Sequence, residues 1–97
     1  MRGEHEQKKR AHVVINGRVQ GVCFRMETQI AADGFDVSGW VKNNRDGSVE
    51  AVFEGDEGAV AEILEWCKEG PPSAKVNKVN VKWETFTGEF RAFEITF

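Results

Sequence analysis

Hydrophobic residues recur along this chain with two kinds of spacing, and each kind predicts a different element. Five segments in which apolar positions adjoin or alternate predict strands: residues 12–15, 37–41, 49–53, 79–83 and 93–97. Residues 24–33 and 60–67 instead carry apolar side chains three, four or seven positions apart, as on one face of a helix. Gly34 closes the first of these helices, and Gly70 followed by two prolines stops the second.

The predicted order is β-α-β-β-α-β with an additional C-terminal strand. Asp46-Gly47 lies between two alternating runs, which is a strong signal for a hairpin because positive φ is easily adopted there. Two helices on one face of an antiparallel sheet bury this many apolar stripes economically. We therefore expect an α+β fold, a ferredoxin-like α/β sandwich formed by residues 11–97, after a flexible polar tail over residues 1–10.

Length and charge restrict the function. A chain of 97 residues has room for one domain and none for separate cofactor and substrate domains. Its 13 Lys and Arg residues against 16 Asp and Glu residues leave a net charge of −3, which opposes general binding to nucleic acid or an anionic membrane. No apolar run approaches the roughly 20 residues of a bilayer helix. Any anion must therefore be held by a local site.

The cysteines and histidines do not indicate a disulfide framework or a metal site. Cys23 and Cys67 are only one pair, and the sequence leaves a bridge between them open. Neither His5 nor His12 stands at metal-ligand spacing from a cysteine, so no metal is expected. The basic, polar N-terminal stretch lacks the apolar segment of a signal peptide, and we expect a cytoplasmic protein.

The stretch between the first strand and the first helix has the composition of a phosphate-binding loop. Gly17 and Gly21, four residues apart, allow the backbone to curl with its N–H groups inward, and the helix N-terminus adds aligned dipoles. Arg25 falls in the first helical turn, where its planar guanidinium can bind two phosphoryl oxygens. The competing interpretation is that the glycines only form a turn and that Arg25 is exposed to solvent without a ligand.

Asn43 ends the strand that precedes the hairpin. With Asn44 beside it, the ordinary interpretation is a residue that prepares the turn. In the expected topology, however, the first strand and the strand that ends at Asn43 run parallel and finish at the same edge of the sheet. A carboxamide at that edge could orient a water molecule beside the loop.

Two blocks of sequence, residues 17–25 (GRVQGVCFR) and residues 39–43 (GWVKN), followed by Gly47, Val49 and Gly55, resemble both signature blocks of the acylphosphatase family in order and spacing. The resemblance runs from about Ala11 to Phe97. It implies the ferredoxin-like sandwich and the hydrolysis of acyl phosphates to a carboxylate and inorganic phosphate. By the resemblance, Arg25 and Asn43 are the catalytic residues. It also implies a phosphate site made, together with Arg25, by Arg18, Val19, Gln20, Gly21, Val22 and Cys23.

The implied chemistry needs no cofactor, and the implied partner is a small acyl phosphate, with inorganic phosphate or another small anion in the same site. We expect a monomer, because helices and sheet account for the apolar stripes. The sequence departs from the family at Asp36, where a glycine is common, and at Met26 and Glu27, where aromatic residues are common. Cys23 as a covalent nucleophile is the less favoured mechanism.

The alternative to an enzyme is a non-catalytic binding module. A ferredoxin-like domain could keep the loop without turnover and act as an RNA-binding or anion-binding module. The aromatic-rich RNP1 pattern is absent from the sequence, and the acidic balance opposes RNA. RNA retention without hydrolysis would favour this alternative over the enzyme.

Overall fold

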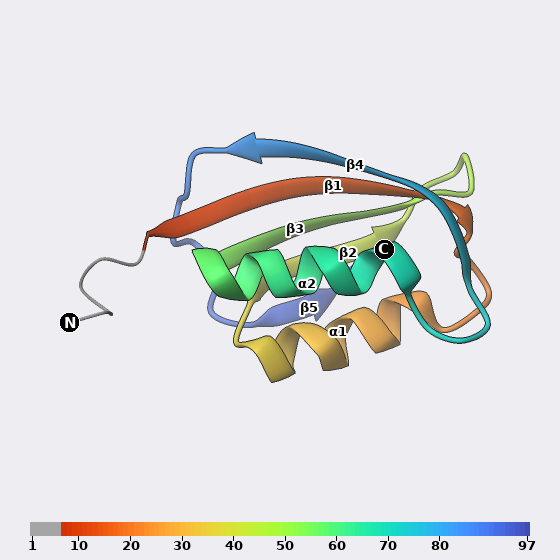
Figure 1. Cartoon of the computed structure of the whole chain (residues 1–97), viewed down its shortest axis with the longest axis horizontal. Helices are drawn as coiled ribbons and strands as arrows, with labels where there is room; N and C mark the ends of the chain where they lie inside the picture. Colours follow the sequence, from red (N-terminus) through yellow and green to blue (C-terminus); the bar gives the residue numbers. More distant parts are fainter. Residues whose placement is uncertain (1–6) are drawn as a thin grey trace.

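The computed structural model describes residues 7–97, which form a five-stranded sheet with both helices packed against the same side (Figure 1). The order of strands across the sheet is β4-β1-β3-β2-β5. This arrangement confirms the expected ferredoxin-like sandwich with an additional C-terminal strand. In chain order the elements are β1 (Lys8–Arg18), α1 (Phe24–Phe35), β2 (Ser38–Asn43), β3 (Val49–Asp56), α2 (Glu57–Glu69), β4 (Lys75–Glu84) and β5 (Phe93–Ile95).

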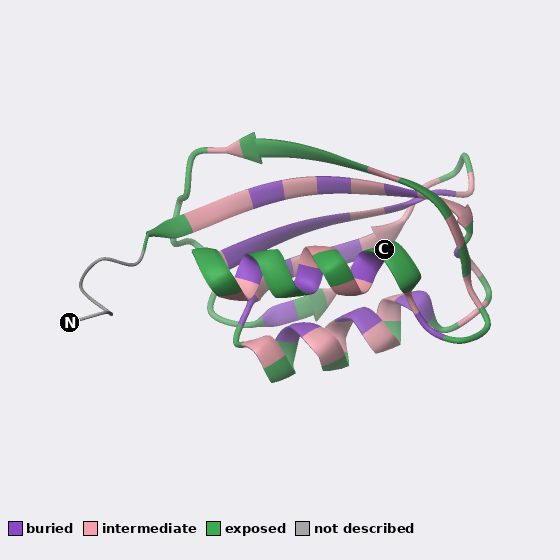
Figure 2. Ribbon diagram, in the orientation of Figure 1, coloured by how far each residue is buried: buried purple, intermediate pink, exposed green. Residues whose placement is uncertain are grey.

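The core lies between the helices and one face of the sheet (Figure 2). Alternate residues of β1 and β3 are fully buried on that face, as period-two alternation requires. The helices oppose them with one stripe each, and Thr28 of α1 satisfies its buried hydroxyl by donating to the carbonyl of Phe24 at 2.7 Å. The buried hydrophobic residues that form this core are Ala11, Val13, Ile15, Val19, Phe24, Ala32, Val37, Val41, Val49, Ala51, Phe53, Val60, Ile63, Cys67 and Phe93.

The sheet is mixed, whereas the sequence predicted an antiparallel one. β5 pairs parallel with β2, and every other pair of neighbours is antiparallel. The path of the chain explains the difference. β4 ends beside the beginning of β1, with Glu84 opposite Arg10, and β2 begins at this same end of the sheet. The chain leaves β4 at that end, so a strand added along the free side of β2 starts where β2 starts and runs parallel to it.

The first strand begins three residues before residue 11, where the sequence placed the start of the domain. Residues 8–10, predicted as the end of a flexible tail, belong to β1, and residues 1–6 of that predicted tail lie outside the described residues. The three residues are polar and lack an apolar period, but pairing with β3 holds them in the sheet. Lys8 lies opposite Asp56 and forms an ion pair with it, and Arg10 lies opposite Glu54. Cross-strand pairs of opposite charge, and not burial of apolar side chains, therefore stabilise this part of β1.

The connection between β4 and β5 covers part of the sheet face opposite the helices. It is anchored on the buried carboxylate of Glu54, which accepts from the N–H of Thr87 at 3.0 Å, the hydroxyl of Thr87 at 2.9 Å and the N–H of Gly88 at 3.0 Å. Arg10 Nη1 donates to the same carboxylate at 2.9 Å. Burial raises the pKa of Glu54, but these donors outweigh it, so the pKa lies below its ordinary value of 4.5.

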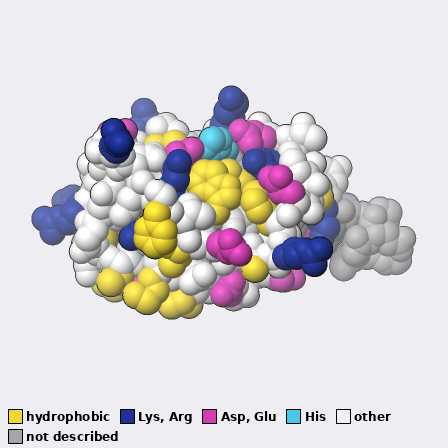
Figure 3. All heavy atoms as spheres, turned by 180° about the vertical axis from the view of Figure 1, so that it is seen from behind, with side chains coloured by type: hydrophobic (Ala, Val, Ile, Leu, Met, Phe, Trp, Pro, Cys, Tyr) yellow, Lys and Arg dark blue, Asp and Glu magenta, His cyan; other side chains and the backbone are white. Residues whose placement is uncertain are grey.

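Figure 3 views the molecule from behind and shows histidine, acidic and hydrophobic side chains close together on this face. His12 of β1 lies between two carboxylates, with Nε2 2.5 Å from Glu50 and Nδ1 3.1 Å from Glu84. The hydrogen bond to Glu50 contributes most to raising the pKa of His12 above its ordinary 6.5, and Glu84 adds to it.

Neither helix within residues 7–97 combines the length and the apolar run that crossing a membrane requires. The two cysteines are unpaired. Cys67 is buried on the core side of α2, as its position in the apolar stripe predicted, and burial raises the pKa of its thiol to about 12. Cys23 is exposed and precedes the first residue of α1.

Candidate active site

A cavity of about 480 Å³ opens at the edge of the sheet where β1 and β2 end and α1 begins. The parallel course of β1 and β2, both antiparallel to the intervening β3, brings these ends together. Five of the site residues predicted from the sequence meet in its wall, namely Val19, Gly21, Cys23, Arg25 and Asn43. The remaining lining residues are Phe24, Met26, Ile95 and Phe97.

The loop from β1 to α1 is curled at Gly21 and Cys23, whereas Gly17, the other glycine of the predicted loop, lies within β1 and pairs with Val76 of β4. Gly21 has φ of 76°, and Cys23 adopts the left-handed conformation, with φ of 63° and ψ of 25°. Within residues 7–97, no hydrogen bond joins the backbone N–H of Gly21, Val22 or Cys23 to another group of the protein. Neighbouring N–H groups in such a turn, followed by a helix N-terminus, form a concave site of positive potential suited to an anion.

The side chain of Gln20 fixes this loop to the β2–β3 hairpin. Its Nε2 donates to the carbonyl of Asn44 at 2.7 Å and to the carbonyl of Ser48 at 2.9 Å. The hairpin is itself braced, because the N–H of Asn44 donates to the carbonyl of Ser48 at 2.8 Å and the hydroxyl of Ser48 donates to Asp46 at 2.6 Å. The amide donors of Gln20 thus position the loop, and Gln20 does not line the cavity.

Arg25 is held by the last two residues of the chain. Its Nη1 donates to the carbonyl of Thr96 at 3.3 Å, and its guanidinium carbon lies 5.0 Å from the centre of the Phe97 ring. The ring face attracts the cation and limits the directions that the flexible side chain can take. The bond to Thr96 uses one of the five guanidinium donors, so the others remain for a ligand in the cavity.

Asn43 is the last residue of β2 and lies opposite Val49 of β3. Alternate residues of β2 face the helices, and Gly39 and Val41 are buried on that side. Asn43 follows Val41 by two residues and so lies on the helix side of the sheet as well. The half-buried side chain lines the same cavity as Arg25. The neighbouring Asn44 serves the hairpin instead, donating from Nδ2 to the hydroxyl of Ser48 at 3.0 Å. The two adjacent asparagines therefore have separate tasks.

Three other residues of the predicted phosphate site lie outside the cavity or in its apolar base. Arg18 is exposed at the end of β1, opposite Lys75, and does not line the cavity. Val22 is half-buried and packs against the core, also outside the lining. Val19 does line the cavity, as a buried residue of its base.

The structure adds residues that the sequence pattern did not point to. Thr96 and Phe97 support Arg25, although the pattern suggested only a strand face for Phe97. No local motif marks them. Only the topology could have indicated them: a C-terminal strand that runs parallel beside the strand ending in Asn43 also ends close to the site.

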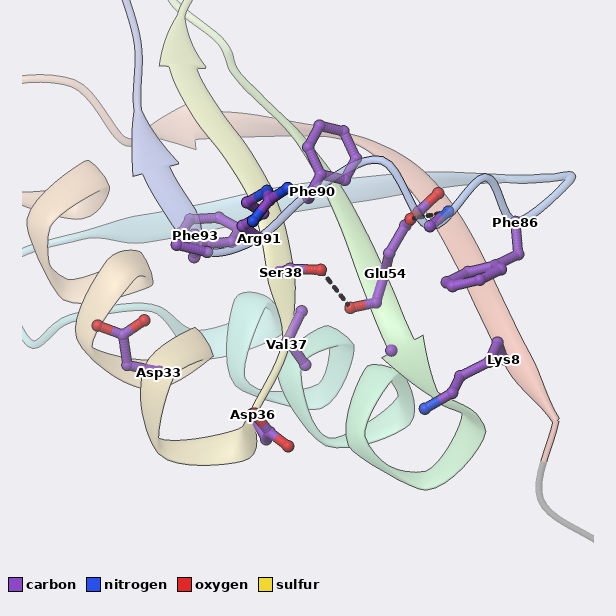
Figure 4. A pocket seen from close by; sticks show the side chains of 13 residues that line it. Lys8, Asp33, Asp36, Val37, Ser38, Glu54, Phe86, Phe90, Arg91 and Phe93 are labelled. Atoms are coloured by element: carbon purple, nitrogen blue, oxygen red, sulfur yellow. Dashed lines mark hydrogen bonds between the residues drawn. The ribbon is translucent and has the colours of Figure 1, made fainter. Parts of the chain in front are cut away.

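A second cavity, of about 450 Å³, lies at the opposite end of the sheet (Figure 4). Asp33 and Asp36 stand on one side of it, and Lys8 and Phe86 on the other. None of the residues proposed from the sequence motifs lines it. Within residues 7–97, no group of three or more His, Cys, Asp and Glu side chains is arranged to hold a metal ion.

Comparison with known proteins identifies the family of this chain. The family model of the acylphosphatases matches residues 11–95. An acylphosphatase of Pelotomaculum thermopropionicum is 51% identical over 90 residues, which cover 93% of this chain and 98% of the relative. One of Syntrophobacter fumaroxidans is 57% identical over 93% of both chains. The crystal structure of acylphosphatase from Bacillus subtilis matches with a TM-score of 0.88 and 37% identity, over 92% of this chain and 99% of that one.

Proposed function

Because this chain belongs to the acylphosphatase family and is an enzyme that hydrolyses acyl phosphates, we propose that Arg25 and the backbone of residues 18–23 bind the phosphoryl group while Asn43 orients the attacking water. The observation that supports these roles is the convergence of three groups in one cavity. The curled loop contributes unbonded N–H groups, α1 contributes Arg25, and β2 contributes the Asn43 carboxamide.

The chemistry matches what these groups can supply. Phosphoryl transfer through a loose transition state depends on positioning and on stabilising charge at the equatorial oxygens. Backbone N–H groups and a guanidinium provide both, and we propose that the reaction proceeds without a metal ion. The leaving group is a carboxylate, a weak base near neutral pH, so no general acid is needed. A carboxamide has no useful basicity, and the phosphoryl oxygens are the proposed acceptors of the water proton.

The test is hydrolysis of acetyl phosphate by the wild type and by Arg25→Ala, in buffer containing a chelator. We expect Arg25→Ala to lower kcat/KM at least about a hundredfold, because one preorganised charged donor to the transition state is lost. Arg45→Ala is the matched control, since Arg45 is an exposed arginine of the nearby hairpin that does not line the cavity. Undiminished turnover in Arg25→Ala, or activity that depends strictly on added metal, would refute the assigned roles.

Asn43→Ala separates binding from catalysis in the same assay. The variant should lower kcat by about a hundredfold or less and leave competitive inhibition by inorganic phosphate nearly unchanged, because the proposed partner of Asn43 is water and not the phosphoryl group. Loss of phosphate inhibition together with turnover would instead place Asn43 in the anion site.

We further propose that the protein acts in the cytoplasm as a monomer, with a small acyl phosphate or a small anion in the site and neither nucleic acid nor membrane as partner. One chain supplies the whole wall of the cavity, and the net charge of −3 disfavours extended polyanions.

A further inference from the structure

β4 is a long free edge of the sheet. It has ten residues, pairs with β1 on one side and has no strand on the other, as Figure 1 shows. Within residues 7–97, no loop or cap hydrogen bond reaches the outer backbone groups of β4. β5, at the opposite edge, is only three residues long. A long strand with unpaired N–H and C=O groups is a template for a further strand.

The two faces of β4 differ in chemical character. Val79, Val81 and Trp83 lie opposite buried residues of β1 and therefore on the helix side of the sheet. Lys78 and Lys82 alternate with them and so lie on the open side of the sheet. Lysine and apolar side chains thus alternate along the free edge.

The lysines on the open side lack an acidic partner. Lys75, Lys78 and Lys82 are exposed, and no carboxylate within residues 7–97 forms an ion pair with any of them. Figure 3 shows Lys and Arg side chains at the upper edge of the molecule, where β4 runs. These positive charges gather on one strand of a chain whose net charge is −3. Their local excess favours an acidic partner.

A hollow of about 300 Å³ lies between β4 and α2 on the helix side. β4 contributes Val81 and Trp83, which are 39% and 56% exposed. Apolar side chains of a strand added beside β4 would enter this hollow, because every second residue of such a strand faces the helix side. The residues that line the hollow are Ala61, Leu64, Glu65, Lys68, Val81 and Trp83.

A second copy of this chain fits the edge less well than an acidic strand. Two β4 strands joined in one sheet, with their helices on the same side, would place the lysines of both copies on one face. Like charges on neighbouring strands repel, and lysines on edge strands commonly prevent self-association for this reason. The same charges attract a strand that carries carboxylates.

We propose that β4 binds an extended segment of another protein, in which acidic and apolar residues alternate, as an added strand of the sheet. Backbone hydrogen bonds to the outer side of β4 supply affinity. Carboxylates of the segment pair with Lys78 and Lys82 on the open side, and its apolar side chains enter the hollow beside Trp83. No residue of β4 lines the active-site cavity, so this binding site is separate from the one that hydrolyses acyl phosphates.

The probe for this site is a capped ten-residue peptide in which glutamate alternates with valine, labelled with a fluorophore and titrated with the full chain at low salt. Fluorescence anisotropy gives the dissociation constant. We expect saturable binding that weakens as salt is added, because the ion pairs are exposed. A peptide in which lysine alternates with valine, and one with all glutamates in a single block, should each bind at least tenfold more weakly. Equal binding of the probe and either control would overturn the proposal.

Lys78→Glu tests the pairing of charges. The variant should bind the probe about fivefold more weakly, since a favourable cross-strand pair becomes a pair of like charges. Arg91→Glu is the matched control, because it changes the net charge equally at an exposed residue outside β4, and it should leave the affinity unchanged. Hydrolysis of acetyl phosphate at the wild-type rate shows that each variant is folded. Equal affinities of the two variants would contradict the proposal.

Two N-methylated forms of the probe test the backbone pairing. In an extended strand all glutamate N–H groups point to one edge and all valine N–H groups to the other. Because only one edge of the probe faces β4, methylation of one set should weaken binding at least tenfold more than methylation of the other. Equal affinities would overturn strand addition. A dimer of the free chain that protects the amides of β4 from hydrogen exchange would also overturn it, since a second copy then covers the edge.

Discussion

At the scale of single residues, Gly39 shows how little freedom the sheet leaves near the site. It lies in β2 with φ of 138°, opposite Phe53 of β3. A Cβ built on this residue would lie 1.8 Å from the carbonyl oxygen of Val52, and so the strands could not keep their spacing. The same strand ends in Asn43, four residues later. The glycine of the Gly-Trp pair is therefore required by close packing of backbone, and no contact with a ligand is needed to explain it.

Gly39→Ala should lower the free energy of unfolding by more than about 2 kcal/mol, because it adds a backbone clash to a φ that L-residues rarely adopt. Gly58→Ala is the matched control: Gly58 lies in α2, with no atom within 4 Å of an added Cβ. That change should raise the stability by about 0.5 kcal/mol, as a helical alanine does. Urea unfolding of both variants measures the difference, and equal effects would contradict the argument.

At the scale of elements, the site depends on how the β1–α1 loop is tied to the β2–β3 hairpin. The two amide hydrogen bonds of Gln20 cross between them at 2.7 and 2.9 Å. The loop carries the proposed phosphate cradle, and the hairpin follows directly on Asn43. Because the side chain of Gln20 joins the two elements, we expect the distance between the proposed phosphate cradle and Asn43 to depend on Gln20.

Gln20→Ala should raise the inhibition constant for inorganic phosphate by up to about thirtyfold, since each of the two lost hydrogen bonds contributes on the order of 1 kcal/mol to holding the loop. Gln29→Ala is the control, because Gln29 of α1 also donates its amide to a carbonyl, that of Phe93 at 3.0 Å, and does not line the cavity. Steady-state inhibition in the acetyl phosphate assay gives both constants. An unchanged constant in Gln20→Ala would show that the loop is positioned without this tie.

At the scale of the whole molecule, an ionic network joins three strands and the β4–β5 connection on the sheet face away from the helices. Arg10 contacts Glu54, Glu84 and Glu89, and His12 bridges Glu84 to Glu50. Hydrogen bonds to Glu84 and Glu54 are the main reason that the pKa of Arg10 is raised, so its charge is constant in the physiological range. Hydrogen bonds from Arg10 and His12 lower the pKa of Glu84.

These shifts predict a stability maximum on the acidic side of neutrality. His12 has a raised pKa in the fold, so its contribution is complete below the ordinary 6.5 and is lost as the pH rises through the folded value. Glu54 has a lowered pKa, so its contribution is present above the ordinary 4.5 and is lost as the pH falls through the folded value. The free energy of unfolding should therefore be greatest between about pH 5 and 6.

Urea unfolding measured from pH 3 to pH 9 tests this dependence of the free energy of unfolding on pH. His12→Gln should remove the loss on the alkaline side and keep the loss on the acid side, because Glu54 and its donors are untouched. A wild type whose stability does not fall above pH 6.5, or a His12→Gln variant with the same alkaline loss, would contradict the role given to His12.

Local sequence patterns determined most of the elements and part of the site. The two helices, the Asp46-Gly47 turn and a segment of each of the five strands followed from local sequence, because the spacing of apolar residues reports the period of each element but not its full length. The same patterns placed the Gly21 loop, Arg25 and Asn43 at one edge, because strand direction follows from the order of elements. Those inferences need no knowledge of contacts between distant segments.

Tertiary structure alone decided the rest. Residues 8–10 joined β1 because carboxylates of β3 oppose Lys8 and Arg10, and β5 ran parallel to β2 because β4 ends at the end of the sheet where β2 begins. The support of Arg25 by Thr96 and Phe97 spans more than 70 residues of sequence. Periodicity can assign a side chain to a face, but which distant group meets it depends on the path of the whole chain. The physical reason is that these contacts arise from strand order and edge position, which no local spacing encodes.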